Sequence, residues 1–428
     1  MTKKISVWLA AVLVIFACAI TFELTVVFGD IFSKYEPEVV IPESTADIAE
    51  TTAPEEETEP AFEEELISRV TEKARAVLDL YARYYVGEID IDEVAEGAAE
   101  GIVAYMGDKY GDYHNAEEYA EIMEGYSGEF AGIGVSVVLN YDYYAIEILQ
   151  VMNNSPALEA GLQPNDLIVK VGGEDIVSVG YNEAINRIRG EVGTEVTLTI
   201  ARGDDYSEVF DVTLTRRKVE EESVTYELIG IDGLFRPIAY VRVLDFNHLT
   251  PDQFIDAVGE CIGEHKVHGF IFDLRDNGGG ELNAVVTMLD ALLPEGPIVR
   301  IQYKDGEEKV YESDARYIDE PIVVLVNGNT ASAAELFTAA LRDYGKAIVV
   351  GETTYGKGTV QSLIPFSDGS AVRVSTSMYL PPFSDNFEGI GVKPDVEASL
   401  PDEYKNVNLF KLAHENDAQL QAALGLYK

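Results

Sequence analysis

Two short segments carry side chains that could cleave an acyl bond. The first runs from Asn327 to Glu335, follows an apolar stretch and contains Ser332. A serine at the start of a helix lies where backbone N–H groups point outward, and these groups stabilise developing negative charge. Helix capping is the alternative role, because serine and threonine are common caps and Thr330 could also serve. Ser332 is therefore a candidate nucleophile, with capping still open.

The second segment supplies a candidate base. Lys357 lies between two glycines, 25 residues after Ser332. A serine hydroxyl needs a base, and no histidine lies in a glycine-framed motif. With an ordinary pKa near ~10.4, only about one lysine in ~2500 is neutral at about pH 7, so the amine must be buried in an apolar pocket. Gln361 could orient this amine by a hydrogen bond without restoring its charge.

Nucleotide and metal chemistry are disfavoured. Gly351 to Lys357 satisfies G-x-x-x-x-G-K, but Gly358 stands where a serine or threonine would coordinate magnesium. The segment also leads into an expected strand over 359–365 and not into a helix. The five histidines show no H-E-x-x-H spacing, and no D-x-[DN]-x-[DN]-G calcium run occurs. Cys18 and Cys261 offer neither a disulfide framework nor a cysteine zinc site. We expect no metal and no cofactor.

The composition indicates a folded, acidic protein. Of 428 residues 47% are hydrophobic, which excludes wholesale disorder. Lysine and arginine total 31 against 76 acidic residues, a formal net charge of −45. A surface this negative repels phosphate backbones, so nucleic-acid binding is not expected.

The first 65 residues resemble a membrane-targeting segment and a tether. Lys3 and Lys4 precede Ile5 to Phe22, which carries no charge and would span about 27 Å as a helix. Residues 1–28 are therefore expected to be a signal anchor of the cytoplasmic membrane, or a signal segment cleaved near Ala17-Cys18-Ala19 or at an imperfect lipobox. Either way, the rest of the chain would lie outside the cytoplasm. Residues 29–65 are acidic and contain four prolines, which predicts a disordered linker.

A helical region is expected at residues 66–126. Apolar residues recur at intervals of three and four from Leu66 to Tyr81, and further helices are expected over 91–106 and 116–123. These helices are too few for a domain, so we expect them to pack on a neighbouring domain or on a second copy, as a homodimer. Residues 401–428 are expected to form a helical extension packed on the core.

In residues 127–217 the helical pattern gives way to alternating polar and apolar residues and to frequent glycines. This pattern predicts a small, partly open barrel with two short helices. The run Ser155 to Ile168 resembles the S-P-A-x-x-A-G-L-x-x-x-D-x-I signature of PDZ domains. By that resemblance a peptide's C-terminal strand would add to a sheet edge, with its carboxylate held by a glycine-containing loop. The loop residues would be Gly132, Ile133, Gly134 and Val135. The helix 181–189 would form the facing wall.

Residues 218–400 alternate strand-like and helix-like segments. The expected strands are 238–244, 269–274, 322–326 and 347–350, and the expected helices are 251–264, 281–293 and 331–344. This order predicts an α/β core, a layered sheet covered by helices.

Three runs together resemble the C-terminal processing peptidases, or tail-specific proteases. They are Asp273 to Gly280, Ala331 to Glu335 and Gly351 to Gln361. The resemblance implies an α/β and α+β multidomain protein with a crotonase-like peptidase core. It also assigns roles to five residues: Ser332 as nucleophile, Lys357 as general base, Gln361 as the orienter of the lysine, and the backbone amides of Gly278 and Ala333 as the oxyanion hole.

Two positions depart from the family pattern or have an open role. Tyr110 to Asn115 stands where the family usually carries an aspartate-proline-histidine-serine stretch, which affects how the helical region meets the core. Asp343 matches an aspartate implicated in some relatives, but it lies about three helical turns from Ser332. We expect a structural role for Asp343.

The expected function is that of a membrane-tethered serine endopeptidase. It would bind the C-terminal tails of protein or peptide substrates in its PDZ domain and cleave them with a Ser/Lys dyad. The alternative is a catalytically inactive PDZ-containing envelope adaptor. The presence of Ser332, Lys357 and Gln361 favours the enzyme.

Overall fold

The computed structural model describes residues 59–428 except residues 204, 315, 406 and 428. The chain divides into two compact units between Glu88 and Ile89. The expected membrane segment at residues 1–28 lies outside the described residues. In the described part of the chain, no helix is both long and apolar enough to cross a membrane.

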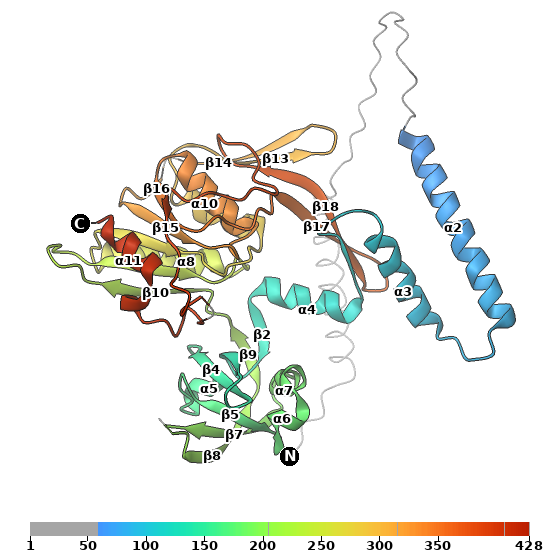
Figure 1. The fold of residues 1–428 in the computed structure, drawn as a ribbon, viewed down its shortest axis with the longest axis horizontal. Coiled ribbons are helices and arrows are strands. Elements are labelled where there is room, and N and C mark those ends of the chain that lie inside the picture. Colours follow the sequence, from blue (N-terminus) through green and yellow to red (C-terminus); the bar gives the residue numbers. More distant parts are fainter. Residues whose placement is uncertain (1–58, 204, 315, 406, 428) are drawn as a thin grey trace, which may run out of the picture. The chain divides into compact units, whose positions relative to one another are not determined.

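The described part of the first unit is dominated by one long helix, α2 (Glu59–Tyr84) (Figure 1). Residues 59–65, which were expected to be disordered linker, are helical. Acidic residues are favourable in the first turns of a helix because they face the positive end of its dipole. Glu65 also forms an i,i+4 ion pair with Arg69 at 3.2 Å, which adds local support.

The second unit begins with two capped helices and a short strand, α3 (Ile91–Ala104), β1 (Asp112–His114) and α4 (Ala116–Ser127). The Asp90 side chain caps α3, and Asn115 with Glu118 forms a capping box on α4. β1 pairs with β18 (Ala371–Leu380) of the core. The stretch that departs from the family pattern therefore joins the helical region to the core.

An inserted module follows, joined to the rest by the paired strands β2 (Glu129–Gly132) and β9 (Arg217–Glu220). Its antiparallel sheet has the order β3-β4-β5-β7-β8, with ranges Val135–Asn140, Ala145–Val151, Leu167–Val171, Glu195–Arg202 and Glu208–Thr215. The short strand β6 (Glu174–Asp175) pairs with β5. β3 and β8 are edge strands, so the barrel is open, as the sequence predicts.

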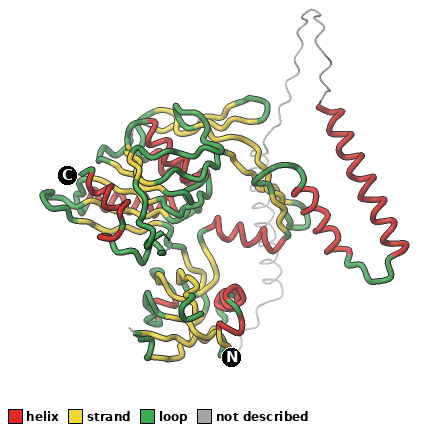
Figure 2. Tube along the Cα trace, viewed as in Figure 1, coloured by secondary structure: helices red, strands yellow, loops and turns green. Residues whose placement is uncertain are grey.

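Three short helices cover the inserted module, one more than expected: α5 (Pro156–Glu159), α6 (Ile176–Val179) and α7 (Tyr181–Ile188) (Figure 2). α6 has only four residues, which is too short for an apolar repeat to reveal it in the sequence. The module has its own core, which includes Ile146, Ile168, Leu198 and Ile200.

The peptidase-like core is built on a six-stranded sheet with the order β10-β11-β12-β15-β16-β19. The strands are Val224–Ile229, Ile238–Val243, Gly269–Asp273, Ile322–Val326, Ala347–Gly351 and Val396–Glu397. β10 is antiparallel to β11, and the remaining neighbours are parallel. The four strands expected from apolar runs are β11, β12, β15 and β16.

Helices cover both faces of this sheet (Figure 1). Alternate strand residues such as Phe272 and Val324 pack with α8 (Thr250–Gly263), α9 (Leu282–Asp290) and α10 (Ala333–Asp343). Their neighbours, such as Ile271 and Val323, pack with α11 (Ala418–Gly425) of the C-terminal extension. The period of two in the strands therefore gives the layered arrangement expected from the sequence. Among the described residues of the extension, only α11 and the single turn η1 (His414–Asn416) are helical.

A second sheet carries part of the site. β18 pairs with β1 near its start and with β13 (Gly296–Tyr303) near its end, and β13 pairs with β14 (Glu308–Ser313). β17 (Thr359–Pro365) also pairs with β18. Of these strands the sequence predicts only β17, because β1 has three residues and β13, β14 and β18 contain no continuous apolar run.

Candidate active site

Ser332 is held in an unusual backbone conformation at the start of α10. Its φ is +56° and its ψ is −118°, and 6% of the residue is exposed. A non-glycine residue with positive φ is strained and persists only where the surroundings hold it. Thr330 does not cap α10, because its hydroxyl donates to the Leu274 carbonyl at 2.8 Å. The site of this strain is the residue that the sequence predicts to be the nucleophile.

The buried carboxylate of Glu335 ties the serine segment to the lysine segment. Its Oε2 accepts the backbone N–H of Ser332 and that of Lys357, each at 2.8 Å. Its Oε1 accepts the N–H of Gly356 at 2.7 Å and the Thr354 hydroxyl. Four donors saturate this carboxylate, so two segments far apart in the sequence are fixed against each other. The S-x-x-E capping-box pattern could have indicated this residue.

Lys357 projects from a glycine-flanked loop toward an aromatic ring. Its Nζ lies 5.1 Å from the centroid of the Tyr110 ring, and the side chain is half-buried. Burial lowers the pKa of Lys357 below its usual value, and the positive charge of Arg373 lowers it further. Carboxylates at Glu388, Asp108 and Glu335 act in the opposite direction.

Ser332, Lys357 and Gln361 line one cavity of about 570 Å³. Among the described residues, no hydrogen bond joins Ser332 Oγ to Lys357 Nζ. In substrate-free enzymes such contacts are often long and tighten only in the substrate complex. Tyr379 lines the same cavity, and burial raises its pKa to about 12.

Gln361 lies on β17 and reaches the cavity without contacting the amine. Its Nε2 donates to the hydroxyl of Thr359 at 2.8 Å and to the Thr359 carbonyl at 3.1 Å. The structure thus brings Gln361 beside Lys357 in the cavity wall, but its amide is engaged by its own strand. An orienting role for Gln361 stays a prediction.

The two predicted oxyanion donors flank the serine. Gly279 packs so closely on it that an added Cβ would lie 2.9 Å from Ser332 Cβ. The Gly279 N–H is already engaged, because it donates to Asn277 Oδ1 at 2.8 Å. Among the described residues, the N–H groups of Gly278 and Ala333 make no hydrogen bond. They are therefore available to an acceptor in the cavity, and an oxyanion-hole role for them stays a prediction.

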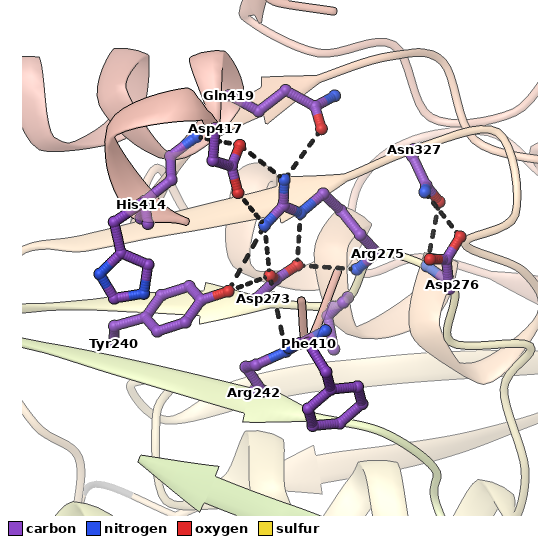
Figure 3. Close-up of polar contacts among 12 residues, drawn as sticks. Tyr240, Arg242, Asp273, Arg275, Asp276, Asn327, Phe410, His414, Asp417 and Gln419 are labelled. Atoms are coloured by element: carbon purple, nitrogen blue, oxygen red, sulfur yellow. Dashed lines mark hydrogen bonds and ion pairs between the residues drawn. The ribbon is translucent and has the colours of Figure 1, made fainter. Parts of the chain in front are cut away.

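Buried ion pairs anchor the segment Asp273 to Gly280, which carries the glycines beside Ser332 (Figure 3). The Arg275 guanidinium contacts the carboxylates of Asp273 and Asp417 at 2.7 and 2.8 Å, and donates to Gln419 Oε1 at 3.0 Å. Asp417 and Gln419 belong to the C-terminal extension, so this extension anchors the end of β12. The side chain of Asn327 adds a second tie, because it donates to Asp276 at 2.8 Å.

A second cavity, of about 580 Å³, lies in the inserted module between the β3 edge and α7. All four predicted loop residues line it: Gly132, Ile133, Gly134 and Val135. Gly134 has a φ of +78°, and a Cβ there would lie 2.3 Å from Ser155 Cβ. A glycine is required at this position by both conformation and space. Asp245 lines both this cavity and the one around Ser332.

Comparison with known proteins identifies the family to which the chain belongs. The profile for Peptidase family S41 matches residues 237–398, and the PDZ domain profile matches residues 124–201. A carboxy-terminal-processing protease of Bartonella bacilliformis is 32% identical over 335 residues, which cover 76% of this chain and 74% of that protein. The chain belongs to the carboxy-terminal-processing proteases.

A second relative and one solved structure are also similar to this chain. The carboxy-terminal processing protease CtpA of Bacillus subtilis is 33% identical over 320 residues, which cover 74% of this chain and 66% of that relative. The structure of a putative S41 protease from Bacteroides fragilis matches with a TM-score of 0.55 and 19% identity, over 80% of this chain and 92% of that one. The last match supports the fold alone. This carboxy-terminal-processing protease is therefore a serine-type peptidase that carries a PDZ domain.

Several residues of this protease site are missed by sequence reasoning. Arg373 and Tyr379 lie on β18, which the sequence does not predict, and Asp108 and Tyr110 lie in the connection before β1. Asp343 has the structural role that we expected, because its Oδ2 accepts the N–H groups of Phe383 and Ser384 at 2.8 Å.

Proposed function

We propose that this chain cleaves the C-terminal tails of proteins with Ser332 as nucleophile and Lys357 as general base. The observation that carries the proposal is the single cavity lined by both side chains, with both backbones fixed to Glu335. The lowered pKa of Lys357 supports it, because a base must be neutral to accept a proton.

The reaction would proceed through an acyl-enzyme. Ser332 Oγ attacks the scissile carbonyl carbon while Lys357 Nζ takes the hydroxyl proton. The N–H groups of Gly278 and Ala333 donate to the oxyanion. The ammonium then protonates the leaving amine, and the C–N bond breaks. Lys357 next deprotonates a water that attacks the ester carbonyl carbon, and it returns this proton to Ser332 Oγ as the C–O bond breaks. Gln361 would orient the amine during these transfers.

The PDZ domain would capture the substrate tail. β3 pairs with β4 on one side only, so its other edge can accept a peptide strand opposite α7. The backbone of Gly132 to Val135 would hold the terminal carboxylate. Since Asp245 borders both cavities, a captured tail would lead toward Ser332, and the cut would fall upstream of the bound terminus.

The location that we propose is the outer side of the cytoplasmic membrane. It rests on Lys3, Lys4 and the uncharged run Ile5 to Phe22. We further propose a homodimer through the helical region, because Ile67, Leu78 and Tyr81 of α2 are exposed. Membrane fractionation and sedimentation of the full chain test these two points: a soluble full chain would contradict the anchor, and a monomer would contradict the dimer.

The central test uses two variants and two measurements. Ser332→Ala and Lys357→Ala should each abolish cleavage of a tailed protein, while tail-peptide binding keeps its Kd. Ser362→Ala, on β17, is a matched control that should cleave normally. Wild-type turnover by either dyad variant would contradict the proposal.

A further inference from the structure

Lys357 lies among negative charges that favour its protonated form. The carboxylates of Asp108, Glu335 and Glu388 each raise the pKa of its amine. None of them forms an ion pair with it. Each is instead satisfied by neutral donors, as Glu335 is by the four described above.

The other two carboxylates are engaged in the same way. Asp108 accepts the Ser375 N–H at 2.7 Å and the Ser375 hydroxyl at 2.8 Å. Glu388 accepts the Gly358 N–H at 2.7 Å and the Tyr110 hydroxyl at 3.0 Å. The bonds of Glu335 and Glu388 position the lysine loop, and those of Asp108 tie the segment before β1 to β18. Together the three carboxylates leave three formal negative charges around a group that must be neutral to act.

Arg373 is the cation that faces these charges from the cavity wall. It lies on β18, between Asp112 of β1 and Leu363 of β17 in the strand register. It is half-buried and lines the cavity with Ser332 and Lys357. Among the described residues, no hydrogen bond or ion pair engages its guanidinium.

The remaining charged groups near the amine do not replace Arg373. Lys109 donates to the Tyr110 hydroxyl at 2.7 Å, but its side chain is exposed to solvent. Asp245 and Glu281 line the same cavity and are negative when ionised; burial raises the pKa of both. The opposite strand neighbour Asp112 is exposed, and its carboxylate accepts the Tyr113 N–H.

We propose that Arg373 is a positioning residue that keeps the amine of Lys357 unprotonated by placing an unpaired positive charge in the catalytic cavity. This inference depends on the proposed role of Lys357 as base. A cation without a counter-ion is normally costly at a half-buried position. Here its field opposes the three carboxylates, so the lysine can be surrounded by acceptors that fix its loop and still lose its proton.

The test compares Arg373→Gln with the charge-conserving Arg373→Lys and with Arg316→Gln. Arg316 is an exposed arginine paired with Asp314, so its loss removes the same charge away from the cavity. Thermal melting checks that each variant is folded. The pH dependence of kcat/KM is then measured for each.

In the wild-type protein kcat/KM should rise with pH as Lys357 loses its proton. Arg373→Gln should shift the midpoint of this rise to a pH about one unit higher, so that kcat/KM is about tenfold below the wild-type value at pH values below the midpoint and recovers above it. Arg373→Lys should restore most of the wild-type profile, and Arg316→Gln should match it. A loss that is equal at every pH, or an unshifted limb, would overturn the inference.

A measurement without catalysis separates this inference from the proposed function. In the Ser332→Ala background, the rate at which acetic anhydride labels Lys357 reports the pKa of the amine, read by mass spectrometry. Adding Arg373→Gln should raise that pKa by about one unit. An unchanged pKa overturns the inference even if the dyad is correct. A raised pKa supports it even if the cleavage assay contradicts the dyad.

Discussion

The backbone N–H groups of Ser332 and Lys357 donate to the same carboxylate oxygen, Oε2 of Glu335, each at 2.8 Å. The residue that presents the hydroxyl and the residue that presents the amine are thereby linked through one buried side chain. Their relative position is fixed by backbone contacts.

Glu335→Ala should therefore reduce both stability and activity. Four buried donors would lose their acceptor, which should lower the free energy of unfolding by at least about 2 kcal/mol. Denaturant unfolding and kcat/KM measure the two effects. Glu403→Ala, at an exposed position, is the control and should change neither. Wild-type kcat/KM in Glu335→Ala would contradict the linking role.

Gly279→Ala should lower kcat as well as stability, because the added Cβ would meet Ser332 in addition to straining the backbone. The new Cβ would press on Ser332 Cβ and on the Ala331 carbonyl, each at 2.9 Å. Gly306→Ala is a matched control, because Gly306 also has a positive φ, +85°, but has open space around it. Both variants should lose about 1 kcal/mol or more of stability. Only Gly279→Ala should lose at least about tenfold in kcat. Equal kcat values for the two variants would show that the close packing of Gly279 on Ser332 does not affect catalysis.

Gly134→Ala should weaken tail binding. A Cβ at Gly134 would lie 2.3 Å from Ser155 Cβ, so the loop that is to hold the carboxylate must move. We expect the Kd of a tail peptide to rise at least about tenfold. Cleavage of a short peptide without a tail should be unchanged. Gly161→Ala, in the same module at a φ of +76° and with open space, should bind normally. Normal binding by Gly134→Ala would place the carboxylate elsewhere.

Activity should rise with pH. Lys357 acts as a base only when neutral, and burial followed by Arg373 lowers its pKa below the ordinary lysine value. As the pH rises through this lowered pKa, the neutral fraction and kcat/KM rise together. The midpoint should fall below that of an exposed lysine. A flat profile between about pH 6 and pH 9 would argue against a lysine base.

The strands of the core sheet could be predicted because β12 and β15 are buried on both faces and read as apolar runs. β18 could not be recognised in this way, because Arg373 and Ser375 interrupt its apolar residues and leave no continuous apolar run. That sheet supplies much of the environment of the lysine. Ser332 and Lys357 could be proposed as a dyad from their local sequence and the family resemblance, whereas their surroundings could not be predicted.

The contacts of Tyr110 illustrate the reason. It lies far from Lys357 in sequence and reaches it only because β1 pairs with β18. No pattern around Tyr110 signals that pairing. Glu335 is different, since its spacing from Ser332 carries a capping-box signal. Its contacts with Thr354 and Gly356 still depend on the folded loop.

The most direct test of the dyad is single-turnover cleavage of a tailed peptide at about pH 8 by wild-type protein and Lys357→Met. Kd for the same peptide is measured in parallel. If Lys357 is the base, Kd should be unchanged and the cleavage rate should fall by at least about a thousandfold. A Lys357→Met protein that binds the peptide and cleaves it at the wild-type rate would contradict the account.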